Sequence, residues 1–193
     1  MASHFFALFS RMKNMDRWAL MRNVRSESLS AHSLEVAAFA HALALIGNRR
    51  LGKNHNADRA AVLGIYHDMP EILTGDMPTP VKYYNPEIRR AFGEIEQAAA
   101  KSITGTLPQD LQADYAPLLQ PDEDAELYKL GKAADKISAL VKCIEEKNSG
   151  NKEFLSAERA TLKALKKLNC PEADIFTEEF LGSYSLVLDN ILK

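Results

Sequence analysis

Cysteine is scarce in this chain and long apolar runs are absent, and both absences restrict what the protein can be. The 193 residues include only two cysteines, Cys143 and Cys170, and neither has a partner in a C-x-x-C pair. Two isolated thiols favour a reduced intracellular protein, although a single disulfide bond stays open. No run of about 18 to 20 apolar residues occurs, and the apolar stretch near the N-terminus is too short for a signal peptide. We therefore expect no membrane span and a cytoplasmic location.

A large excess of either charge is also absent. Lys and Arg together number 24 and Asp and Glu 26, which gives a formal net charge of -2. This balance provides no electrostatic reason to expect binding to nucleic acid or to an anionic membrane surface. With 46% hydrophobic and 26% charged residues, the composition is that of a soluble globular protein. The length suffices to bury a core without disulfide bonds or structural metals, so we expect one domain over residues 1–193.

Repeats, low-complexity tracts and alternating strand-like patterns are missing as well, and apolar residues recur instead at helical spacing. The first long helix is expected between an N-cap at Ser30 and a stop at Gly47. Its inward face is expected to carry the residues that recur at spacings of three and four, namely Leu34, Ala37, Ala38, His41 and Leu45. Further helices are predicted after the cap residues Asn56 and Asn85, and over residues 122–148, 152–168 and 172–191. The sequence therefore predicts an all-α fold.

The segment YHDMPEILTGDMPTP, residues 66–80, gathers an imidazole and three carboxylates where a helix has to end. His67 and Asp68 form a dyad, Glu71 lies within one helical turn of both, and Pro70 prevents a smooth continuation of the helix. An imidazole beside a carboxylate suits a divalent cation such as Mn²⁺, Co²⁺ or Zn²⁺. Two adjacent residues cannot complete a coordination sphere, so further ligands must come from elsewhere in the chain.

His32 and Asp135 are the candidates for those further ligands. His32 is expected in the first turn of its helix, on the polar side. Asp135 lies at the edge of the apolar stripe of a long helix, where a carboxylate has to be paired, hydrogen-bonded or bound to a metal. The other histidines fit simpler interpretations, because His41 lies on the expected core face while His4 and His55 read as surface or loop residues. We find no second cluster, which argues for a single-metal site.

A His-Asp dipeptide taken alone is more often structural than functional, so the order of the whole set matters. His32, then His67-Asp68, then Asp135 on a later helix resembles the H…HD…D signature of the HD-domain metal-dependent phosphohydrolase superfamily. The flanking segments SHFFALFSRMKNMDRWALMRNVRSESLSAHSLEVA and YHDMPEILTGDMPTPVKYYN are similar to the bacterial 5'-deoxynucleotidase family within it.

This resemblance implies a fold, a reaction and partners. The fold would be a single helical HD-type bundle, and the reaction hydrolysis of 2'-deoxyribonucleoside 5'-monophosphates to deoxyribonucleoside and phosphate. The family uses one divalent ion, Co²⁺, Mn²⁺ or a similar metal, and commonly forms homodimers. The chemistry of attack on a phosphomonoester independently requires a metal ion and residues of these kinds. A metal lowers the pKa of a water, a cation holds the phosphate and an acid/base group manages the protons.

The resemblance also implies a role for each candidate of the metal centre. His32, His67, Asp68 and Asp135 would bind the metal, and all of these except His67 would contact the substrate as well. Glu71 would orient or deprotonate the nucleophilic water. Arg17 would hold the phosphate, because a guanidinium group meets phosphate oxygens with a planar fork. Without the resemblance, Arg17 would be interpreted as a surface cation at a helix end.

The sugar of the substrate would lie between Trp18 and the loop that follows Glu71. Trp18, otherwise a core or interface anchor, would wall the sugar and disfavour a 2'-hydroxyl by leaving it without space or a hydrogen-bond partner. Asp76 would accept a hydrogen bond from the 3'-hydroxyl or help to protonate the leaving 5'-oxygen. Met77, Pro78 and Thr79 would contact the substrate from the same loop, although simple turn chemistry explains Pro78 equally well.

Two other functions stay open at the level of the sequence. Another HD-type phosphohydrolase would act on a nucleoside triphosphate, a cyclic nucleotide or a guanosine tetraphosphate alarmone. A triphosphate needs several more cations around its phosphates, and nothing in the sequence places the basic segments NRRLGKN and IRR in the pocket. A catalytically silent helical scaffold is the second alternative. Glu71 and Asp76 argue against it, because a scaffold needs a carboxylate at neither position.

Overall fold

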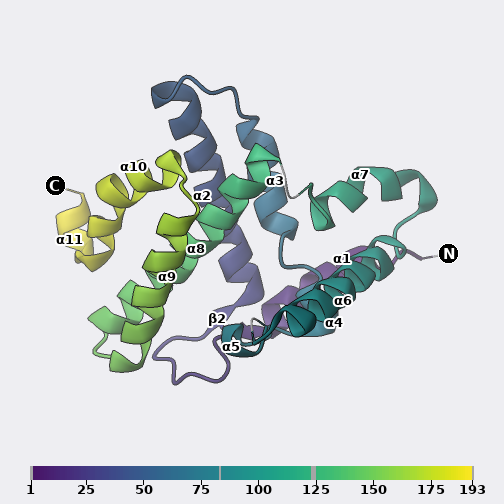
Figure 1. The fold of residues 1–193 in the computed structure, drawn as a ribbon, viewed down its shortest axis with the longest axis horizontal. Helices are drawn as coiled ribbons and strands as arrows, with labels where there is room; N and C mark the ends of the chain where they lie inside the picture. Colours follow the sequence, from purple (N-terminus) through teal and green to yellow (C-terminus); the bar gives the residue numbers. More distant parts are fainter. Residues whose placement is uncertain (1, 83, 123–124, 193) are drawn as a thin grey trace.

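The computed structural model describes residues 2–82, 84–122 and 125–192, apart from the side chains of Thr79 and Pro80. Most of this part is helical, which confirms the all-α prediction (Figure 1). One small antiparallel strand pair lies outside it and aligns Arg17 with Glu27. The elements in chain order are α1 Phe5–Phe9, η1 Ser10–Asn14, β1 Asp16–Arg17, β2 Glu27–Ser28, α2 Leu29–Arg50, α3 Ala57–Tyr66, α4 Glu71–Thr74, α5 Thr79–Lys82, α6 Pro86–Thr104, α7 Gln109–Leu119, α8 Glu126–Asn148, η2 Lys152–Phe154, α9 Leu155–Lys167, α10 Pro171–Phe180, η3 Leu181–Ser185 and α11 Leu188–Ile191.

Local cap chemistry places two helix starts correctly and one incorrectly. The side chains of Asn56 and Asn85 accept hydrogen bonds from the backbone N–H groups of residues 59 and 88, as predicted for N-caps. The cap of α2 is Ser28, two residues before the predicted Ser30. Gly47 does not end that helix, which continues to Arg50. A Cβ at Gly47 would lie 2.9 Å from side-chain atoms of both His55 and Glu172, so this glycine makes room for packing instead.

The predicted inward face of α2 is wrong. Leu34 and Leu45 are 71% and 41% exposed, whereas Val36, Ala40 and Leu43 are fully buried. The cause is that apolar residues surround this helix on nearly every side, so that two different faces satisfy the same spacing of three and four. By length and composition α2 could cross a membrane, but half of its apolar window is buried inside the protein, as in the core helix of a helical bundle.

Three predictions about the positions of histidines are also wrong. His32 is completely buried and does not lie on a polar side. His41 is half-exposed, with its Nε2 3.9 Å from Asp58, and does not fill the core. His55 is buried and is not a surface or loop residue without contacts. Its two ring nitrogens lie 3.3 and 3.4 Å from the carboxyl groups of Glu126 and Glu172. Burial of these rings depends on helices that are distant in the sequence, which a single-helix pattern does not contain.

The described core divides into two apolar clusters joined along α2. One cluster packs α2 against α3, α8, α9 and α10 through small and medium side chains such as Ala40 and Ala134. The other gathers α1, α6, α7 and the start of α2 around Leu29 and Met69. His32 lies on the same face of α2 between Leu29 of one cluster and Val36 of the other. The joint between the clusters is therefore where α2 buries the imidazole of His32.

The C-terminal half differs from the prediction mainly at helix ends. The predicted helix over 122–148 begins at Glu126, and the one over 152–168 starts with the short turn η2 before α9. The predicted helix over 172–191 is broken into α10, η3 and α11. Cys143 and Cys170 are buried free thiols, which confirms the reduced interpretation over the disulfide bond.

Candidate active site

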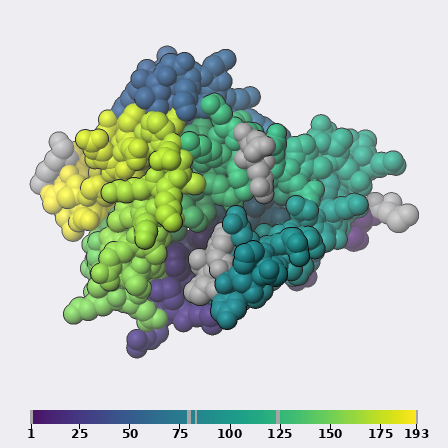
Figure 2. All heavy atoms as spheres, in the orientation of Figure 1, coloured from purple at the N-terminus to yellow at the C-terminus, as the bar shows by residue number. Residues whose placement is uncertain are grey.

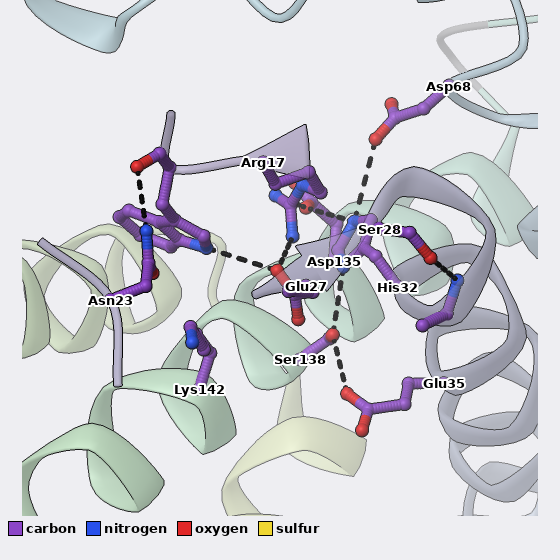
Figure 3. Close-up of polar contacts among 12 residues, drawn as sticks. Arg17, Asn23, Glu27, Ser28, His32, Glu35, Asp68, Asp135, Ser138 and Lys142 are labelled. Carbon is purple, nitrogen blue, oxygen red and sulfur yellow. Dashed lines mark hydrogen bonds and ion pairs between the residues drawn. The ribbon is translucent and has the colours of Figure 1, made fainter. Parts of the chain in front are cut away.

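Four side chains from three helical segments meet at the joint between the two clusters. His32 comes from the first turn of α2, His67 and Asp68 from the turn after α3, and Asp135 from the middle of α8. Figure 3 shows His32, Asp68 and Asp135 close together. Nε2 of His32 lies 3.4 Å from Oδ1 of Asp135 and 3.5 Å from Oδ2 of Asp68. Nε2 of His67 lies 3.0 Å from that Asp68 oxygen. The structure therefore brings together the four residues that the sequence singled out.

The donor atoms of this cluster fit a divalent cation. His32, His67 and Asp135 offer ligand atoms within 4.8 Å of one another. Nε2 of each histidine is buried without a hydrogen-bond partner among the described residues. Nδ1 of His67 donates to the carbonyl oxygen of Gly64 at 2.8 Å, and because a carbonyl only accepts, the proton is on Nδ1 and the lone pair on Nε2. A buried nitrogen with a free lone pair, facing carboxylates, is what a metal ligand requires.

Gly64 has a second effect on the position of His67. A Cβ at this glycine would lie 2.6 Å from the Cα and 2.7 Å from the backbone nitrogen of Ala37 on α2. Only a glycine lets α3 approach the backbone of α2 this closely. The helix crossing that brings His67 to His32 therefore depends on the absence of a side chain at residue 64.

The three carboxyl groups nearest to the histidines differ in protonation. Burial raises the pKa of Asp68, but the neighbouring His67 and His32 outweigh burial and hold this pKa well below its usual range. Burial likewise opposes ionisation of Asp135, and Lys136 and His32 overcome it, so its pKa is also well below the usual range. Glu71 behaves in the opposite way, because burial and the charge of Asp68 raise its pKa to about 9. Different environments thus separate two ionised carboxylates from one that favours the neutral form.

Glu71 begins α4 directly after the bend at Pro70. Its Oε2 is buried and has no hydrogen-bond partner among the described residues. The short helix ends at Gly75, whose φ of +76° lies in the left-handed region that glycine adopts without strain. The predicted break after the dyad is therefore present, and it presents an unpaired carboxyl group beside the histidines.

Arg17 and Trp18 reach the site from the strand pair and share one anchor. Oε2 of Glu27 accepts hydrogen bonds from Nη1 of Arg17 at 3.0 Å and from Nε1 of Trp18 at 3.1 Å. The second guanidinium nitrogen lies 3.8 Å from Asp135, so Arg17 bridges Glu27 and the histidine cluster. The Trp18 ring packs against Phe154 with centroids 5.4 Å apart. Glu27 was not anticipated, although its alignment opposite Arg17 would follow from a hairpin between them.

The segment that follows Trp18 is tied to α8 by a buried ion pair. Glu146 accepts hydrogen bonds from the backbone N–H groups of Val24 and Arg25, from Asn151 and from Lys142. Burial opposes its ionisation, but the hydrogen bond from Lys142 and those from the backbone lower its pKa to about 2. The Glu146 and Lys142 side chains are only 2% and 5% exposed. This pair fixes the loop that positions Arg17 and Trp18.

The loop predicted to contact the sugar is more exposed to solvent than the histidine cluster. Asp76 is exposed, and its charge acts on both Arg17 and Glu71. Met77 is half-buried and Pro78 exposed, while the side chain of Thr79 lies outside the described residues. The structure thus directs the charge of Asp76 toward the site and adds no evidence for a contact by Thr79.

A cavity of about 320 Å³ adjoins the cluster and shares His67, Asp68 and Glu71 as walls. Its walls also carry two cations, Lys82 and Lys132, that the sequence did not place there. Figure 2 shows the surface hollowed beside the teal α6 region, whose Gly93, Glu96 and Gln97 line this cavity. A ligand bound at the histidines therefore has room to extend away from them.

Solved structures define the class of fold. An HD-domain phosphohydrolase from Listeria innocua has a TM-score of 0.82 at 24% identity, covering 94% of this chain and 88% of that chain. The cyanophage S-2L HD phosphohydrolase, solved with dA and one catalytic Zn²⁺ ion, has a TM-score of 0.67 at 16% identity, covering 92% and 96%. At these identities the likeness shows the fold alone, and that fold is the predicted HD-type helical bundle.

Sequence comparison identifies the family within that class. The family model described as 5'-deoxynucleotidase YfbR-like matches residues 4–184. A 5'-deoxynucleotidase of Photobacterium profundum is 47% identical over 190 residues, covering 98% of each chain. One from Vibrio vulnificus is 48% identical with the same coverage. The chain belongs to the YfbR-like 5'-deoxynucleotidase family.

Proposed function

We propose that this protein hydrolyses 2'-deoxyribonucleoside 5'-monophosphates to deoxyribonucleoside and phosphate with the help of one divalent metal ion. The observation that carries the proposal is the pair of buried Nε2 atoms of His32 and His67, which have no hydrogen-bond partner in the described part of the chain and face Asp68 and Asp135. These atoms occur in a chain whose curated relatives are named 5'-deoxynucleotidases.

The metal would be held by His32, His67, Asp68 and Asp135. Two imidazoles and two carboxylates suit Mn²⁺, Co²⁺ or a similar borderline cation. Such a cation lowers the pKa of a water and neutralises phosphate oxygens. Its charge would also favour the ionised form of Glu71, because a nearby positive charge opposes the effect of burial and of Asp68 on that carboxyl group.

The remaining residues would position the reactants and move protons. Glu71, whose buried Oε2 has no hydrogen-bond partner within the described residues, would orient the attacking water and take its proton. Arg17 would hold the phosphate, since Glu27 and Asp135 fix its guanidinium group at the edge of the cluster. Asp76 would bind the 3'-hydroxyl or supply a proton to the leaving 5'-oxygen.

Selection against ribose would depend on Trp18. The hydrogen bond to Glu27 and the packing on Phe154 hold the indole ring in one orientation next to Arg17. A rigid ring leaves a 2'-hydroxyl without space or a partner, and buried polar groups without partners are strongly disfavoured. Met77, Pro78 and Thr79 would complete the substrate contacts from the loop after α4.

A second candidate has one observation in its favour. Lys82 and Lys132 line the cavity next to the cluster, and a triphosphate needs additional cations. Lys82 is, however, paired with Glu96 at 2.7 Å, and the charge of Asp135 acts on Lys132. Cations that already have acidic neighbours favour the monophosphate over the triphosphate.

We also propose that the protein works as a cytoplasmic homodimer, as its family resemblance and composition imply. Analytical ultracentrifugation of the purified protein tests the dimer directly. A single species with the mass of one chain would contradict it.

Phosphate release from a matched panel of nucleotides tests the reaction. The protein is treated with a chelator, dialysed and then supplied with Mn²⁺, Co²⁺, Zn²⁺ or Mg²⁺. The substrates are compared in pairs, dAMP with AMP and dTMP with 3'-dTMP, and dGTP and a cyclic nucleotide are added to the panel. Metal-dependent release from dAMP and dTMP, with little from AMP or 3'-dTMP, is the expected result. Release only from dGTP or the cyclic nucleotide would favour the second candidate, and no release with any metal would favour the scaffold.

A further inference from the structure

A short relay of side chains lies behind His32, on the side away from the other ligands. Nδ1 of His32 lies 2.9 Å from Oγ of Ser138, and that hydroxyl donates to Oε2 of Glu35 at 2.8 Å (Figure 3). His32 and Ser138 are fully buried, while Glu35 is partly buried. None of the roles proposed above uses Ser138 or Glu35.

The order of donors and acceptors in this relay has one consistent solution. The hydroxyl proton of Ser138 is directed to Oε2 of Glu35, which accepts it. The Ser138 oxygen then accepts the proton on Nδ1 of His32. With Nδ1 protonated, a neutral imidazole keeps its lone pair on Nε2, the atom that faces Asp68 and Asp135.

Helical spacing shows that the relay is built into the two helices that carry the ligands. Glu35 follows His32 by three residues on α2, and Ser138 follows Asp135 by three residues on α8. Residues at this spacing lie on the same face of a helix. Each helix therefore supplies one ligand and, one turn later, one member of the relay. A fully buried hydroxyl is costly without partners, and Ser138 has a partner on each side.

We propose that Ser138 and Glu35 are positioning residues that fix the ring orientation and tautomer of His32 and thereby set the affinity for the metal. The inference rests on the proposed metal site. His67 is oriented differently, by the backbone carbonyl of Gly64, so the two histidines have separate supports. Only the support of His32 consists of side chains and can be removed by substitution. Loss of such a partner typically weakens metal binding about 10- to 100-fold.

The test is the dissociation constant for Co²⁺, measured by calorimetry on chelated and dialysed protein. We expect Ser138→Ala to raise this constant about 10- to 100-fold. Glu35→Leu should raise it in the same direction. Glu35→Gln should have a smaller effect, because its amide oxygen still accepts from Ser138. The absorption bands of bound Co²⁺ give a second readout, which should change in Ser138→Ala if the His32 ring tilts.

Ser33→Ala is the matched control. Ser33 is a buried serine of α2, next to His32, whose hydroxyl has no partner among the described residues, so its removal deletes the same atom as Ser138→Ala without touching the relay. Its Co²⁺ constant should stay within about twofold of wild type. Equal affinities for Ser138→Ala and wild type, or an equal loss in Ser33→Ala, would overturn the proposal.

Two further measurements keep the outcome clear. If Ser138→Ala does not fold, Glu35→Leu at its partly buried position carries the test, and wild-type affinity there would overturn the proposal. Phosphate release from dAMP should recover in Ser138→Ala at saturating Co²⁺, because the relay acts through affinity. Failure of the proposed substrate would leave the Co²⁺ result intact, so the two hypotheses fail separately.

Discussion

Replacing Glu146 by glutamine should destabilise the protein and release the loop that positions Arg17 and Trp18. The carboxylate accepts from two backbone N–H groups of that loop and from Lys142. A glutamine of the same size turns an N–H group toward some of these donors. It also leaves the Lys142 charge buried without its counterion.

The magnitude follows from the pKa of Glu146. This pKa falls from an ordinary 4.5 to about 2 in the folded protein. A difference of about 2.5 pKa units at about 1.36 kcal/mol each corresponds to about 3 kcal/mol. Breaking a buried ion pair by removing one partner costs about 3–5 kcal/mol, which agrees. Because the folded pKa is depressed, the stabilisation is complete above pH 4.5 and is lost as the pH falls toward 2.

Urea denaturation of wild type and Glu146→Gln at two pH values measures the effect. The difference in free energy of unfolding should be about 3 kcal/mol at pH 7 and less than half of that at pH 3, because protonation of Glu146 in the unfolded state removes the rest. Glu179→Gln is the control, because its ion pair with Arg50 is exposed and should contribute less than about 1 kcal/mol. A difference below about 1 kcal/mol at pH 7, or one that is the same at both pH values, would refute the reasoning.

Three other predictions concern the site itself. Glu71→Gln should lower kcat for dAMP by about 10²- to 10⁴-fold. Its metal content, measured by elemental analysis, should stay unchanged, and a loss of metal would move Glu71 from catalysis to coordination. Trp18→Ala should raise the ratio of kcat/KM for AMP to that for dAMP, and an unchanged ratio would argue against the sugar wall. Adding Co²⁺ at 100 times its dissociation constant to chelated protein should raise the free energy of unfolding by about 2.7 kcal/mol, and no rise would argue against a specific site in the folded state.

Helix starts were predictable where the signal is local. Asn56 and Asn85 cap their helices because a cap needs only a side-chain oxygen and the N–H groups of the next turn. The buried face of α2 was not predictable, since its apolar residues satisfy several faces. Only the packing of α3 and α8 decides that Val36 is buried and Leu34 exposed.

In the candidate site, too, some residues were predictable from the sequence and others were not. The order of His32, His67-Asp68 and Asp135 is visible in the sequence, and the structure brings the four together. Ser138 and Glu35 carry no sequence signal of their own. Their hydrogen bond joins residues 103 positions apart and depends on how α2 meets α8. Lys82 and Lys132 were missed for the same reason, because a cavity wall is assembled from several helices.

The backbone contact at Gly64 determines when the site acquires its shape. Since α3 rests on the backbone of α2 there, the spacing of His32 and His67 is settled as the helices dock and needs no ion to pull the rings together. The entropy cost of ordering these ligands therefore belongs to folding, and an arriving cation finds them already arranged. The set of protected amides in α2 and α3 should then be the same with and without metal, and bound metal should slow their exchange only by the common factor that its effect on global unfolding requires.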